Sequence, residues 1–180
     1  MSFSSEKMQH AILFFLERIN NVHLGRTKLM KLLYYVDFDH YEKHGRSVTN
    51  AAYKKLPHGP VPEQAERLIK RMVREGLVLA VNAKAGDYAQ HRLIAQCRFD
   101  ASRFSGDELQ TLERVAKEWE DCTASEIEAA SHAEAPWSAT RDGRLIDYEL
   151  ACYRRPLGSE PLDARLAKSS AFAKYVAAVA

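Results

Sequence analysis

One face of a predicted helix carries residues whose types and spacing could hold a metal ion. Asp37, His40 and His44 are three and four residues apart, which places their side chains on one side of a helix. Carboxylate oxygens and imidazole nitrogens are common zinc ligands. The local sequence HYEKH nevertheless differs from the HExxH motif, because Glu42 falls two residues after the first histidine and points to another face. We therefore favour a structural role for these residues and expect no metal site.

Asp37 itself interrupts an apolar stretch, KLLYYVDFDHY. A lone carboxylate in an apolar interior would cost several kcal/mol, so Asp37 must have a partner. The candidates are a backbone amide and the side chains of Tyr34, His40, Tyr41, Lys54, Lys55 and His58. We expect one of the last three, which would attach the helix to the proline-rich stretch LPHGPVPEQ. Asp37 would then be a structural residue rather than a catalytic acid.

Nothing in the sequence indicates nucleophilic catalysis. The three cysteines, Cys97, Cys122 and Cys152, are far apart and form no CxxC motif. The chain also has no GxSxG motif and no glycine-rich phosphate loop. We predict reduced thiols, no cofactor and no enzymatic activity.

A basic stripe is the second feature that could bind a ligand. Arg67, Lys70, Arg71 and Arg74 recur at spacings of three and four on a predicted helix that ends near residue 75. A predicted β-hairpin follows, with Lys84 in it, and this order is the outline of a winged helix whose basic face contacts DNA phosphates. The alternative is a solvated helix face, which we favour because a basic stripe alone is weak evidence.

Periodicity and capping signals predict a mainly helical domain with a small antiparallel β-hairpin, an α+β fold that resembles a winged helix in its middle. The predicted helices cover residues 4–19, 27–45, 62–75, 105–121 and a short segment from Thr123. An extended segment is predicted for residues 46–56, a hairpin for 77–81 with 88–95, and a further short strand for 97–99. Residues 131–144 are predicted as a loop, 145–153 as either strand or helix, and 162–180 as a helical tail.

Composition is typical of one soluble globular domain. Of the 180 residues, 46% are hydrophobic and 28% are charged, and the net charge is only +2. The longest apolar run, residues 11–16, is too short to cross a bilayer, and the N-terminus does not resemble a signal peptide. We expect a cytoplasmic protein without membrane contact. Its charge is uneven, because residues 1–75 have 13 basic and 8 acidic side chains, whereas residues 76–149 have 8 and 14.

Several motifs in a fixed order resemble a known family. They are KLMKLLYY at residues 28–35, Asp37 with Phe38, GRSVT at 45–49, GPVP at 59–62, SHAEAPW at 131–137, and Ile146-Asp147-Tyr148 with Ala151. Together they resemble the Panacea domain of SocA-like antitoxins and phage-associated proteins. The resemblance covers about residues 5–155, so we expect a domain over residues 1–155 and a linker with a tail over residues 156–180.

The resemblance implies a helical module that binds another protein and has no established catalytic residues. Family members are typically antitoxins that neutralise a toxin encoded beside them, and the SocA-type member delivers its toxin to a AAA+ protease. As parts of the family's motifs, Lys31, Asp37, Gly59, Pro60 and Trp137 are expected to serve the shared fold. We expect the partner surface to include Tyr41, His44, Lys55 and His58, beside the second helix and the LPHGPVP stretch.

Overall fold

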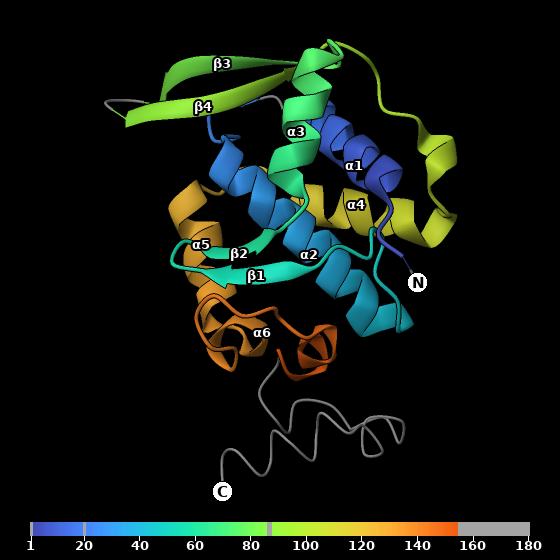
Figure 1. Ribbon diagram of the computed structural model, residues 1–180, viewed down its shortest axis with the longest axis vertical. Helices are drawn as coiled ribbons and strands as arrows, with labels where there is room; N and C mark the ends of the chain where they lie inside the picture. The colour runs from blue at the N-terminus through green and yellow to red at the C-terminus, as the bar shows by residue number, and fades with distance from the viewer. Residues whose placement is uncertain (1, 20, 86–87, 155–180) are drawn as a thin grey trace, which may run out of the picture.

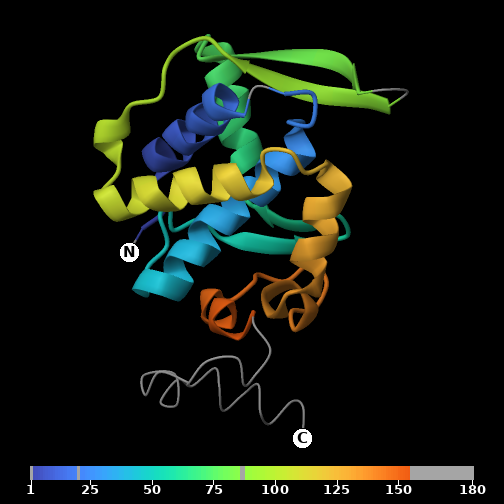
Figure 2. The same cartoon turned by 180° about the vertical axis from the view of Figure 1, so that it is seen from behind.

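Helix α2 (Arg26–His44) forms the centre of the structure, a computed structural model that describes residues 2–19, 21–85 and 88–154. The other elements are α1 (Ser5–Arg18), β1 (Tyr53–Leu56), β2 (Gly59–Pro62), α3 (Ala65–Arg74), β3 (Val78–Ala85), β4 (Tyr88–Ala95), α4 (Gly106–Trp119), α5 (Ala124–Ala133) and α6 (Ala135–Ser138), with short 3-10 helices at Ala101–Arg103 and Tyr148–Tyr153. The views from both sides show α2 crossing the middle of the molecule (Figure 1, Figure 2). The predicted fold class, mainly helical with small antiparallel sheets, is confirmed.

Burial on all sides explains why α2 is apolar around most of its circumference. It packs against α1, α4, α5 and β2. Tyr35 stacks on Trp119 of α4, and Phe38 stacks on Tyr148 near the C-terminal end of the described chain. A helix without a solvated face must find apolar neighbours in every direction, and here the surrounding elements supply them.

Capping signals predicted three helix starts correctly. The Ser4 side chain accepts a hydrogen bond from the Lys7 amide at the start of α1. Ser105 with Glu108 and Thr123 with Glu126 form the two predicted capping boxes, which begin α4 and α5.

Helix α2 begins differently from the prediction. Its N-cap is Gly25, which offers no side-chain hydrogen bond, and Thr27 lies inside the first turn. The end of the helix is as predicted, because Gly45 takes the left-handed conformation with φ of 67°.

The proline-rich stretch forms a hairpin, which the sequence did not reveal. Strand β1 pairs with β2 in register from Tyr53 opposite Pro62 to Leu56 opposite Gly59. Pro62 therefore ends a strand and does not open the next helix, which starts at Ala65. Pro60 lies opposite Lys55, whose backbone N–H and C=O bond residues 143–144 on the other side. The missing proline N–H groups thus remove no hydrogen bond between β1 and β2.

The second predicted hairpin is confirmed, with β3 running further than expected, to Ala85. The strand predicted for residues 97–99 is wrong, because Phe99 instead packs edge-on against Phe14 of α1. The predicted loop at residues 131–144 contains the end of α5 and all of α6, and the ambiguous residues 145–153 become a bridge at Leu145 and a 3-10 helix.

A buried ion cluster holds the last described residues against α2. The Arg154 guanidinium contacts Asp39, Glu42 and Glu134, and its side chain is only 7% exposed. The helical tail predicted for residues 162–180 lies outside the described residues. Within the described part of the chain, no helix is long and apolar enough to cross a membrane.

Candidate functional site

Asp37 is fully buried and is held by the segment that follows α2. Its Oδ1 accepts a hydrogen bond from the Thr49 amide at 2.6 Å, and its Oδ2 accepts from the Thr49 hydroxyl and from the Tyr53 hydroxyl at 2.8 Å. The predicted partners Lys54, Lys55 and His58 are wrong, although a backbone amide was correctly among the alternatives. Burial raises the pKa of Asp37 from 3.8 to about 6, against the opposing effect of these hydrogen bonds.

Asp37 bonds Thr49 and Tyr53, whereas the two histidines considered as metal ligands contact α4 and each other. His40 Nδ1 lies 2.9 Å from the Thr111 hydroxyl of α4, and the His40 ring stacks on His44. Burial and the neighbouring His44 lower the pKa of His40 to about 4. In the described ranges, no group of three or more His, Cys, Asp or Glu side chains is placed to hold a metal ion.

The predicted partner-binding residues do not gather on one surface. Tyr41 packs on Tyr148, and His44 stacks on His40 near the end of α2. The Lys55 ammonium is used internally, because it donates to the Thr140 carbonyl at 2.8 Å.

A cation–π contact also engages Lys55, whose Nζ lies 3.9 Å from the centre of the Trp137 ring. The Trp137 indole N–H donates to the Leu56 carbonyl, so this predicted motif residue buttresses the β1–β2 hairpin. His58, by contrast, has a side chain that is 83% exposed at the tip of the hairpin. The four predicted partner residues thus remain a proposal, and only His58 lines the largest groove described below.

The α3 stripe is exposed but partly neutralised. Lys70 pairs with Glu66 at 2.9 Å, and Arg71 lies 3.9 Å from Glu75. Arg67 and Arg74 have no ion pair among the described residues. A face with two free arginines is compatible with either a solvated helix or a contact with phosphates.

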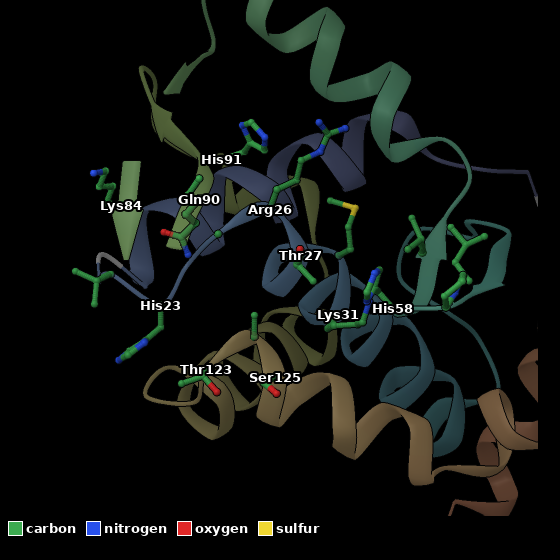
Figure 3. A pocket seen from close by; sticks show the side chains of 18 residues that line it. His23, Arg26, Thr27, Lys31, His58, Lys84, Gln90, His91, Thr123 and Ser125 are labelled. Atoms are coloured by element: carbon green, nitrogen blue, oxygen red, sulfur yellow. The ribbon is translucent and has the colours of Figure 1, made fainter. Parts of the chain in front are cut away.

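The largest groove for which the structure gives a lining lies between the start of α2 and both hairpins (Figure 3). Its volume is about 1220 Å³. Its walls come from the α1–α2 loop and the first turns of α2, the tip of the β1–β2 hairpin, the β3–β4 hairpin, and the start of α5. The space is large enough for a segment of polypeptide.

The charge of this groove is one-sided. Its lining contains Arg26, Lys31 and Lys84 with three histidines, and no aspartate or glutamate is among its described lining residues. Carboxylates outside the lining also interact with it: Glu66 lies 3.9 Å from Arg26, Glu128 lies 3.3 Å from His58, and Glu126 interacts electrostatically with His23. The groove is therefore a basic surface in a protein that is nearly neutral overall.

The start of α2 adds to this positive potential. Its first turn contains no acidic residue, and its N-cap, Gly25, makes no side-chain hydrogen bond. Helices α1, α4 and α5 each have an acidic residue in the first turn and an N-cap side chain that accepts a hydrogen bond. Among the described residues, no capping side chain accepts a hydrogen bond from the first amides of α2. Together with the helix dipole, they favour an anionic group in the groove.

Two buried lysines on α2 differ in how many hydrogen bonds their ammonium groups donate. Lys28 donates to the carbonyls of Glu120 and Cys122, which follow the end of α4. Lys31, one turn later and only 1% exposed, has a single contact with the Pro60 carbonyl at 3.5 Å and no ion pair in the described chain. Burial lowers the pKa of Lys31 from 10.5 to about 8. Lys31 therefore retains hydrogen-bonding capacity at the wall of the groove.

Gly59 leaves the space through which the Lys31 side chain passes. It has φ of 95°, and a Cβ added there would lie 2.5 Å from Lys31 Cε. The motif residues Lys31, Gly59 and Pro60 thus meet at one point, where the hairpin crosses α2.

We predict that Gly59→Ala lowers the free energy of unfolding by about 3 kcal/mol, because backbone strain and a steric clash add together. Gly45→Ala is the matched control, since Gly45 also has a positive φ but no atom within 4 Å of the added Cβ. It should cost about 1–2 kcal/mol. Urea denaturation of both variants measures the difference, and equal losses would show that the contact with Lys31 is unimportant.

Sequence reasoning missed most of this groove. Lys31, His58 and Lys84 lie on different elements, and nothing in their spacing shows that they share a cavity. The signal that was available is the start of α2, where a glycine precedes a turn without acidic residues.

Comparison with known proteins finds one family. The family model described as "Antitoxin SocA-like, Panacea domain" matches residues 29–138. This range contains the larger part of α2, both hairpins, α3, α4, α5 and α6. No curated protein and no solved structure matches the chain.

Proposed function

Because the chain belongs to the antitoxin SocA-like Panacea domain family, we propose that it is an antitoxin that neutralises a toxin by binding it. The observation that supports this function is the basic groove, which is open and lies on the family's own elements. All of its walls except the α1–α2 loop and the first residues of α2 lie within residues 29–138. Binding rather than catalysis fits the site, because its charged groups are not arranged as a nucleophile with a base.

Neutralisation can follow from contact alone or from delivery of the toxin to a AAA+ protease. The groove supports the contact that both routes require, and it is where we place the toxin. His58, at one edge, joins the originally expected residues to this surface. We assign Tyr41, His44 and Lys55 a minor part in the contact at most, because each packs against other residues of the chain.

Co-expression tests the function. Each gene adjacent to the one for this protein is induced alone and then together with it, and growth and co-purification are measured. One neighbour should stop growth alone, be harmless with this protein, and co-purify with it. Rescue that also needs a host AAA+ protease would assign the adaptor route. If no neighbour is toxic or bound, the antitoxin role is rejected.

Duplex DNA is the second candidate ligand. It is favoured by Arg67 and Arg74, which are exposed on α3 directly before the β3–β4 hairpin. Binding through this face should weaken steeply with salt and be lost in Arg67→Gln/Arg74→Gln. A mobility-shift titration at two salt concentrations, with the promoter of its own gene and an unrelated duplex, decides whether this activity exists.

A further inference from the structure

We propose that the groove binds an extended, carboxylate-rich segment of the partner protein, with apolar side chains between its acidic ones. The inference rests on the proposed function for the identity of the partner, but it concerns the chemistry of the bound segment. Three independent features of the described residues support it: the charge of the lining, the apolar surface between the charges, and the buried ammonium of Lys31.

Charge complementarity favours an acidic occupant. Arg26 lies at the uncapped start of α2, and Lys84 lies on another wall of the groove, in β3. Arg26 has only a distant contact with Glu66, and Lys84 has no ion pair in the described part of the chain. Carboxylates of a bound segment would therefore meet cations that are largely free to pair.

Exposed apolar side chains give the segment a place to anchor. Val22 is 57% exposed and Leu56 is 37% exposed, and both line the groove together with Met30 and Val61. Exposed apolar groups framed by polar ones are typical of a protein-binding surface. The mixture predicts a segment that alternates acidic and apolar residues.

Lys31 supplies the specific contact. Its side chain is almost completely buried, yet its ammonium has one 3.5 Å contact with a carbonyl where three donors are available. Lys28 shows that the fold can give a buried lysine two close carbonyl acceptors when it serves the structure alone. A carboxylate in the groove would complete the coordination of Lys31.

Other occupants fit less well. Residues 155–180 of the chain contain four basic and two acidic side chains, so they would repel the groove. A single-stranded nucleic acid would meet the cations but no tyrosine, phenylalanine or tryptophan among the described lining residues, on which bases usually stack. An acidic protein segment uses both the positive potential and the apolar surface.

Selection from a phage-displayed library of random dodecapeptides tests the inference with the full chain as bait. The enriched peptides should carry an excess of Asp and Glu interleaved with apolar residues. The most enriched peptide, made with a fluorescein label, should bind with an affinity about tenfold weaker in Arg26→Gln/Lys84→Gln. The control Arg67→Gln/Arg74→Gln removes the same charge from α3 and should bind like the wild type.

Several outcomes would overturn the proposal. These are no enrichment, enrichment without acidic residues, or equal weakening in the two double variants. Displacement of the peptide by a dodecanucleotide or by a synthetic peptide of residues 156–180 would assign the groove to nucleic acid or to the chain's own end. A dimer that the groove substitutions dissociate would assign it to a second copy. Since no toxin is present, failure here is distinguishable from failure of the co-expression test.

Discussion

Replacing Asp37 with alanine should lower the free energy of unfolding by about 3–5 kcal/mol. The substitution leaves the Thr49 amide and hydroxyl without an acceptor in a site that is fully buried. It also removes the hydrogen bonds by which Asp37 attaches α2 to the segment that leads into the β1–β2 hairpin. Equilibrium denaturation in urea measures the loss, and a change below about 1 kcal/mol would show that the carboxylate does not attach these elements.

Asp37→Asn separates the hydrogen bonds from the charge. The asparagine Oδ1 can still accept from the Thr49 amide, and its NH2 group can donate to the hydroxyls of Thr49 and Tyr53, so at pH 4, where Asp37 is protonated, we expect a much smaller loss. This variant is the matched control for the alanine substitution.

The difference in stability between the wild type and Asp37→Asn should depend on pH, and its sign follows from the raised pKa of Asp37. The folded protein holds the Asp37 proton up to about pH 6, whereas the ordinary pKa is 3.8. Stability from the protonated form is fully present below the ordinary pKa and is lost as the pH rises through the folded one. The stability of the wild type relative to Asp37→Asn should therefore fall by about 3 kcal/mol between pH 4 and 6 and then level off. A constant difference across this range would mean that Asp37 titrates normally.

Replacing Lys31 with methionine should stabilise the fold and impair binding. The wild-type protein bears the cost of an incompletely paired ammonium in a buried position, and methionine fills a similar volume without that cost. We expect the free energy of unfolding to rise by about 1–2 kcal/mol at pH 7. Affinity for an acidic partner should fall by about tenfold.

Lys28→Met is the control, one helical turn away. It removes the donor to the Glu120 and Cys122 carbonyls and should lower the free energy of unfolding by about 1–3 kcal/mol.

Alkaline pH provides a second readout for Lys31. Its depressed pKa of about 8 means that the folded protein loses the proton first, so the disadvantage of the wild type against Lys31→Met should shrink as the pH rises from 8 to 10. If Lys31→Met is instead destabilising at pH 7, the ammonium serves the fold and not a ligand.

Local signals predicted most of the helices and the β3–β4 hairpin, but they did not predict the β1–β2 hairpin or the groove. Ser105 and Thr123 fixed helix starts because a cap acts within four residues. The β1–β2 hairpin was missed because Pro60 and Pro62 normally argue against a strand, and only the pairing register shows that their missing amides are not needed. The sequence analysis expected a lysine or a histidine as the partner of Asp37. In the buried site the partners are Thr49 and Tyr53, which bond the carboxylate without bringing in a second charge.

The candidate site was harder to predict than the fold. Of the expected partner residues, His58 lies in the groove and Lys55 turns inward to the Thr140 carbonyl. Whether a long basic side chain is exposed depends on which distant segment packs against it. Residues 140–144 are far from Lys55 in the sequence but form hydrogen bonds with it in the fold. That Arg26 and Lys84 line one groove becomes visible only when both hairpins and α2 are placed together.

We propose that a toxin is neutralised through the basic groove, and growth rescue by paired charge-reversal variants is the decisive test. The neighbouring toxin is induced with the wild type, with Arg26→Glu/Lys84→Glu, or with Arg67→Glu/Arg74→Glu, all confirmed to be folded and equally abundant. We predict that the groove variant fails to rescue growth and that the α3 variant rescues like the wild type. Full rescue by the groove variant would show that the groove is not needed to neutralise the toxin.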